Sequence, residues 1–125
     1  MLIDTDVLIW MTRGHEGAAA VLQTITPWKI SAVTYMELVQ GCRDKQELAR
    51  IKQGLAFSQT VVLPLSESIS SRAMQLIEHY ALSHGIQLGD ALIAATAIEH
   101  GLAVLTANGK HFTAIEGLAV EVFVP

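Results

Sequence analysis

Five short apolar runs, rich in valine and isoleucine, alternate along the chain with longer segments of helical pattern. The runs cover residues 1–4, 28–33, 60–63, 103–106 and 120–124. Strands that are separated by helices indicate parallel crossover connections, because each helix returns the chain to the same end of the sheet. The pattern therefore predicts an α/β fold with a mostly parallel central sheet of about four to five strands, flanked by helices.

The segments between these runs hold the predicted helices. They span residues 5–11, 16–25, 34–41, 44–57, 66–84 and 88–100, with a short helix at 108–114. No internal repeat, low-complexity tract or linker interrupts this series, and the connections are short. Since 125 residues suit one hydrophobic core, we expect a single domain over residues 1–125.

The charge balance limits the classes of partner. Twelve acidic residues against eight basic ones give a formal net charge of −4. This charge argues against tight nonspecific binding to long duplex nucleic acid, which depends on neutralising many phosphates. Half of the basic residues fall within residues 43–52 together with Asp44 and Glu47. That stretch predicts a solvated helix face that carries ion pairs.

The apolar pattern and the cysteine content indicate where in the cell the protein is located. No segment reaches the roughly 18 apolar residues that a membrane span needs. Asp4 and Asp6 interrupt the apolar run at the N-terminus, so no secretory signal is visible there. The single Cys42 excludes an internal disulfide and a cysteine-based zinc site. We therefore expect a cytoplasmic protein.

Polar residues that follow the predicted strands form a candidate site, because ligands of parallel α/β sheets bind beyond the carboxyl ends of the strands. The residues at these positions are Asp4, Asp6, Thr34, Glu37, Thr106 and Asn108. Asp90 lies in the first turn of an otherwise apolar helix, where a buried unpaired charge would be costly. Sequence spacing alone does not place Asp90 relative to the others. Of the five histidines, only His111 lies near this predicted site.

Three of these side chains, Asp4, Glu37 and Asp90, would repel one another if they converged. A divalent cation would relieve that repulsion. Ligands that are all oxygen, without cysteine or a histidine pair, favour Mg²⁺, for which Mn²⁺ can substitute. Magnesium takes only one or two carboxylates directly and leaves its other positions to water and phosphate oxygens. The acids therefore predict metal-assisted chemistry on a phosphate.

Each of these residues also has a purely structural interpretation. Asp4, Asp6 and Asp90 suit the first turns of helices, where a carboxylate caps the chain and interacts with the helix dipole. Thr34 and Glu37 fit a capping box at the start of their helix.

Four sequence blocks, in a fixed order, carry a family resemblance. They are LIDTDVLI at the start, SAVTYMELVQG around Glu37, LGDALIAATAIEHG around Asp90, and LAVLTANGKHF before the final strand. In these blocks the chain resembles the PIN domain, and more closely the small bacterial and archaeal VapC-type toxins of type II toxin–antitoxin systems. The resemblance covers essentially the whole length, and the order and spacing of the blocks are more specific than any one block.

The resemblance implies a metal-dependent ribonuclease. Such an enzyme would cleave a phosphodiester bond in single-stranded or looped RNA and leave a 5′-phosphate and a 3′-hydroxyl. The acidic residues of the family fall on Asp4, Glu37 and Asp90, which are the implied metal ligands. Of these, Asp4 and Asp90 would ligate Mg²⁺, whereas Glu37 would ligate it or help to activate the attacking water.

The remaining implications concern supporting residues and partners. A fourth family position, often Asp and sometimes Asn, falls on Asn108, which would position metal or phosphate. Asp6 stands where the family commonly has Asn, and Asp6 and Thr106 would support the site. The resemblance also implies an RNA substrate, with tRNA among the candidates, a homodimer, and a small cognate antitoxin that blocks the site.

Two other functions stay open at this point. LIDTDVL also resembles the first motif of haloacid-dehalogenase-like phosphatases, in which Asp4 would be a covalent nucleophile and Asp6 a general acid. That family would need a lysine between Lys52 and Lys110, and the sequence has none there. The third hypothesis is a non-catalytic PIN-like binding module that retains the acids as helix caps.

Overall fold

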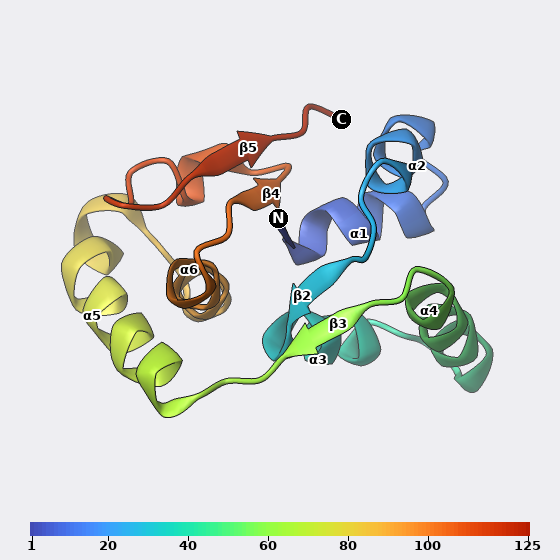
Figure 1. The fold of residues 1–125 in the computed structure, drawn as a ribbon, viewed down its shortest axis with the longest axis horizontal. Helices are drawn as coiled ribbons and strands as arrows, with labels where there is room; N and C mark the ends of the chain where they lie inside the picture. The colour runs from blue at the N-terminus through green and yellow to red at the C-terminus, as the bar shows by residue number, and fades with distance from the viewer.

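The computed structural model, which describes residues 1–125, is built around one five-stranded sheet (Figure 1). The strands follow the order β3-β2-β1-β4-β5, and every neighbouring pair is parallel. Their bounds are Leu2–Ile3 for β1, Lys29–Ser31 for β2, Val61–Leu63 for β3, Val104–Thr106 for β4 and Val120–Val122 for β5. The predicted α/β fold is confirmed, and the sheet is parallel throughout.

Six α-helices and one 3₁₀ helix connect these strands. They are α1 (Thr5–Thr12), α2 (Glu16–Gln23), α3 (Ala32–Gln40), α4 (Lys45–Phe57), α5 (Glu67–His84), α6 (Leu88–His100) and η1 (Gly109–His111). The helix predicted at 108–114 is thus reduced to the short η1 turn. None of the helices has the length and apolar character that crossing a bilayer would require.

The core is divided between the two faces of the sheet. Leu2 of β1 and Val104 of β4 belong to the cluster under α5 and α6, whereas Ile3 and Leu105 belong to the cluster under α1 and α2. Figure 1 shows these helix pairs on opposite sides of the sheet. Because successive side chains of a strand point to opposite faces, a strand covered on both faces is apolar throughout. This explains why the central strands β1 and β4 appear as apolar runs in the sequence.

Helix α3 begins earlier than predicted, and this corrects the capping box proposed for its start. The Ser31 side chain caps the helix by accepting a hydrogen bond from the Val33 amide at 3.1 Å. Thr34 therefore lies inside the first turn, and Glu37 lies one turn further along. Since neither residue is a cap, the Glu37 carboxylate is available for another role.

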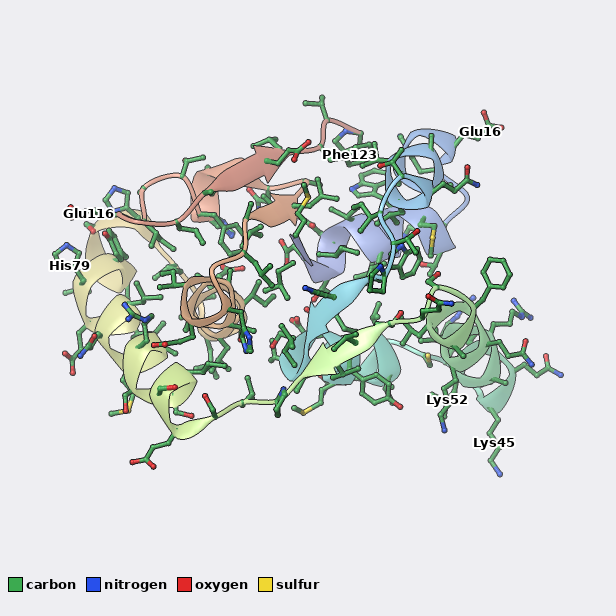
Figure 2. All side chains as sticks on the ribbon, viewed as in Figure 1. Glu16, Lys45, Lys52, His79, Glu116 and Phe123 are labelled. Atoms are coloured by element: carbon green, nitrogen blue, oxygen red, sulfur yellow. The ribbon has the colours of Figure 1, made fainter.

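The basic stretch of residues 43–52 begins just before α4 and continues into this helix, which has no buried residue. Arg43 and Glu47 form an exposed ion pair at 2.7 Å. Lys45 and Lys52 point away from the rest of the protein (Figure 2). The prediction of a solvated helix face with ion pairs is confirmed.

The strand order places a topological switch point beside β1. The chain passes from β1 to β2 and β3 on one side, and then returns to β4 and β5 on the other side. The carboxyl ends of β1, β2 and β4 are therefore neighbours at one edge of the sheet, where parallel α/β proteins bind their ligands.

Candidate active site

Asp4 lies directly after β1, at the switch point, with only 6% of its surface exposed. Its Oδ1 accepts a hydrogen bond from the Thr5 amide at 2.8 Å, which caps α1. Its Oδ2 accepts from the Thr106 hydroxyl, also at 2.8 Å. The structural and functional interpretations of Asp4 therefore apply together, because capping α1 fixes the carboxylate at the end of β1.

The surroundings of Asp4 disfavour its negative charge. Burial, and after it the charge of Asp6, raises the pKa of Asp4 from its usual 3.8 to about 8. The hydrogen bonds from Thr106 and from the Thr5 amide oppose this shift. A buried carboxylate with a raised pKa at the end of a strand is typical of a functional site, and a bound cation would stabilise its ionised form.

Glu37 reaches the same region from α3. Its Oε1 accepts a hydrogen bond from the Thr5 hydroxyl at 2.7 Å. Its Oε2 lies against the first turn of α6, where a Cβ atom built on Gly89 would be 3.3 Å from it. Glu37 is therefore next to the residue that follows Asp4 and next to the residue that precedes Asp90.

Asp90 is the third residue of α6, and its Oδ2 accepts a long hydrogen bond, 3.3 Å, from the Gln87 amide within a capping box. The same oxygen is 3.1 Å from Nδ1 of His111 in η1. Both side chains are partly exposed, at 20% for Asp90 and 27% for His111. This contact joins the start of α6 to the segment that follows β4, which sequence spacing had not established.

The supporting residues join α1 to the segment after β4. Asp6 Oδ1 accepts from the Ala107 amide at 3.2 Å, and Asp6 Oδ2 is 3.4 Å from the Thr106 hydroxyl. The Thr106 hydroxyl also accepts from the Asn108 amide at 2.9 Å, and Asn108 Nδ2 lies 3.5 Å from His111 Nδ1. Asp6 is thus held by the backbone of the neighbouring segment, and the Thr106 hydroxyl connects three groups, the carboxylates of Asp4 and Asp6 and the Asn108 amide.

Together these contacts close into a ring at the carboxyl ends of β1, β2 and β4. In order, the ring contains Asp4, Thr5, Glu37, Gly89, Asp90, His111, Asn108 and Thr106. All six predicted site residues belong to the ring or contact it. Thr5, Gly89 and the contact of His111 were not predicted. A threonine at the first position of a helix has no signal in the sequence that separates it from an ordinary helix start.

The donor set of this ring is made of oxygen atoms from three carboxylates, which is the chemistry that Mg²⁺ and Mn²⁺ prefer. No three histidine, cysteine or acidic side chains lie close enough to hold one ion between them. Glu37 Oε2 and Asp90 Oδ1 accept no hydrogen bond from the protein. The residues fit a hydrated divalent ion, which needs only one or two direct carboxylate ligands. Direct ligation by all three acids stays a prediction.

A groove of about 660 Å³ lies beside the ring, between α1, α3 and α4. Half of its lining residues are hydrophobic, including Leu8, Trp28 and Ile51. Glu37 also lines the groove, and Arg13 and Arg50 are among its charged residues. The groove is thus contiguous with the candidate site through Glu37.

Comparisons with known proteins agree with this architecture. The family model for the PIN domain matches residues 1–118. The chain is 37% identical over 131 residues to ribonuclease VapC10 of Mycobacterium tuberculosis, covering 100% of this chain and 95% of that protein. It is 36% identical to ribonuclease VapC1 of Rickettsia felis, covering 96% and 93% respectively. A solved toxin–antitoxin complex from Klebsiella pneumoniae superposes with a TM-score of 0.79 and 31% identity, covering 94% of both chains. The chain belongs to the PIN-domain family.

Proposed function

We propose that the protein is a metal-dependent endoribonuclease and the toxin of a VapBC-type toxin–antitoxin pair. The observation that carries this proposal is the ring at the sheet edge, whose contacts link Asp4, Glu37 and Asp90 from three separate elements. The similar proteins from Mycobacterium tuberculosis and Rickettsia felis are both named ribonucleases, which favours an enzyme over a non-catalytic module.

The family match argues against the phosphatase hypothesis, and so does the position of Asp6. That hypothesis requires Asp6 to donate a proton to a leaving group. Asp6 Oδ1 instead accepts a hydrogen bond from the Ala107 amide, and Asp6 Oδ2 faces the Thr106 hydroxyl. These contacts direct the Asp6 carboxylate into the protein and leave it the supporting role predicted from the sequence.

The residues of the ring fit Mg²⁺ or Mn²⁺, which Asp4, Glu37 and Asp90 would hold directly or through water. The ion would supply a water nucleophile at neutral pH and neutralise charge on the phosphate. Glu37 is exposed and keeps Oε2 free of protein hydrogen bonds, and in this proposal that oxygen would accept a proton from the attacking water. Asn108 would position phosphate or metal through its side-chain amide.

The substrate we propose is single-stranded or looped RNA, with tRNA among the candidates. Hydrolysis would leave a 5′-phosphate and a 3′-hydroxyl. Because the bases of structured RNA are accessible mainly in loops, a toxin of this kind would select its target through loop shape. The net charge of −4 agrees with binding a short segment of RNA rather than a long duplex. Such a substrate also agrees with the predicted cytoplasmic location.

The groove beside Glu37 is the surface we propose for the antitoxin. An apolar segment with acidic residues would contact Leu8, Trp28 and Ile51 and would pair with the arginines of the groove. Because Glu37 lines the same groove, such an occupant would block the site. Ile51→Asp should weaken copurification with the antitoxin while RNA cleavage continues. The predicted homodimer stays a prediction, and light scattering of the purified chain would test it.

The decisive experiment compares the wild-type protein with Asp4→Asn on total RNA, with Mg²⁺ and with EDTA, followed by sequencing of the RNA ends. Glu78→Gln is the matched control, because Glu78 is an exposed acid of α5 outside the ring. We expect cleavage by the wild type and by Glu78→Gln with Mg²⁺ only, and none by folded Asp4→Asn. Undiminished cleavage by Asp4→Asn, or cleavage that survives EDTA, would contradict the proposal.

A further inference from the structure

The Thr5 side chain joins α1 to α3 within the ring. Its Oγ1 lies 2.7 Å from Glu37 Oε1 and 3.0 Å from Thr34 Oγ1. Its backbone amide donates to Asp4 Oδ1. Thr5 is 7% exposed and Thr34 is fully buried, so water has little access to this pair of hydroxyls. One residue therefore contacts two of the three site acids, through two different groups.

The direction of the hydrogen bonds follows from the number of hydrogens. A hydroxyl carries one hydrogen, so Thr5 can donate to either Glu37 or Thr34 at any moment. The contact to Glu37 is the shorter one, and its acceptor is a carboxylate, which forms the stronger hydrogen bond. Thr5 therefore donates to Glu37, and the Thr34 hydroxyl oxygen is the competing acceptor at 3.0 Å.

The orientation of Glu37 depends on this hydrogen bond. Glu37 is exposed, and a long side chain that nothing holds loses little by moving among its rotamers. With Oε1 bonded to Thr5, the free oxygen is Oε2, and it faces the first turn of α6 beside Gly89. The next residue of that turn is Asp90. Thr5 thus holds one oxygen of Glu37 and leaves free the other, which lies nearer to the first turn of α6.

We infer that Thr5 is a positioning residue of the nuclease site, which anchors Oε1 of Glu37 so that Oε2 alone acts at the reacting centre. This inference rests on the proposed function, because it assigns Thr5 a task within the same site. Thr5 does not itself contact substrate in this account. Its effect on the reaction passes through the Glu37 carboxylate.

The test compares Thr5→Val, which removes the hydroxyl at nearly constant shape, with Thr5→Ser, which keeps it. Thr96→Val is the matched control, because it removes a buried hydroxyl that bonds only to the Leu92 carbonyl within α6. Loss of a residue that orients a metal-site ligand typically costs about 10-fold to 100-fold in metal affinity or activity. We expect Thr5→Val to lower kcat by this factor, with little change in the KM for RNA.

Two further measurements separate positioning from a general structural defect. Calorimetric titration of Mn²⁺ without RNA should show weaker binding by Thr5→Val, and near wild-type binding by Thr5→Ser and Thr96→Val. In a double-mutant cycle, Thr5→Val should change kcat by less than about 2-fold when Glu37 is already Gln, because residues that act through one another are not additive.

The outcomes distinguish this inference from the proposed function. If the wild type binds Mn²⁺ and cleaves RNA, but Thr5→Val does both equally well, the role of Thr5 is refuted. It is also refuted if Thr5→Ser is as impaired as Thr5→Val. The same holds if Thr5→Val lowers kcat by the same factor in the Glu37→Gln background as in the wild type. If the wild type neither binds Mn²⁺ nor cleaves RNA, the proposed function itself fails.

Discussion

Replacing Asp4 by Asn should stabilise the metal-free protein while abolishing its proposed activity. Burial and the neighbouring Asp6 raise the pKa of Asp4 to about 8 in the folded state, against 3.8 when the side chain is free. Between these values the folded protein holds a proton that the unfolded chain has released. Stability must therefore fall as the pH rises through this window, and it stays low above the folded pKa. Asparagine has no such proton, and its side-chain oxygen can still cap α1.

The magnitude of this loss of stability follows from the size of the pKa shift of Asp4. One pKa unit corresponds to about 1.4 kcal/mol, so a shift of about four units costs the folded wild type on the order of 5 kcal/mol above the folded pKa. Most of that cost is added between about pH 5 and pH 8, on the order of 3 kcal/mol. Asn loses one acceptor for the Thr106 hydroxyl, which offsets the gain by about 1 kcal/mol. The free energy of unfolding of Asp4→Asn should therefore exceed that of the wild type slightly near pH 5 and clearly near pH 8.

Urea unfolding followed by circular dichroism, in EDTA and at both pH values, measures this difference. The Glu78→Gln control should keep the pH dependence of the wild type. Saturating Mn²⁺ should stabilise the wild type more than Asp4→Asn, because a ligand that binds only the folded state shifts the unfolding equilibrium. The reasoning would be refuted if the free energies of unfolding of wild type and Asp4→Asn changed in parallel between the two pH values.

Three further predictions concern stability, and equilibrium unfolding tests each of them. Phe112 is fully buried in the cluster under α5 and α6, so Phe112→Ala should cost about 3–5 kcal/mol. The Thr60 hydroxyl is buried without a hydrogen-bond partner, so Thr60→Val should leave the free energy of unfolding unchanged or raise it by up to about 1 kcal/mol. His15 Nδ1 caps α2 by accepting from the Ala18 amide at 3.0 Å, so His15→Ala should cost about 1 kcal/mol and His15→Asn less.

The sheet could be predicted because its signal is local. The central strands β1 and β4 are buried on both faces, and the edge strands β3 and β5, although partly exposed, are still rich in valine, so a short apolar run marks each of them without knowledge of its neighbours. The limits of β2 were less well predicted, because residues 28–33 read as one run, whereas the structure ends the strand at Ser31. Ser31 belongs to the strand and also caps α3. A residue with two roles is difficult to assign from the pattern of its own segment.

The acids that follow strands could also be predicted, since position along the chain determines their place at the sheet edge. Asp90 could not be placed in this way. It opens α6, a helix that precedes β4, so its location depends on how α5 and α6 pack together and against the sheet. The contacts of Thr5 and His111 depend on the same packing, because each joins elements that are distant in sequence. Tertiary contacts of this kind leave no periodic signal.

The structural and catalytic interpretations of the acids prove to be compatible rather than competing. Asp4 caps α1 and Asp90 takes part in the capping box of α6, and these local bonds hold both carboxylates at their positions in the ring. Capping requires only an acceptor oxygen, whereas a metal site requires negative charge. An amide in place of either acid therefore keeps the helix start and removes the charge. For this reason the Asn variants should fold but fail to cleave RNA. If the acids served only as helix caps, the Asn variants would show no such difference between folding and cleavage.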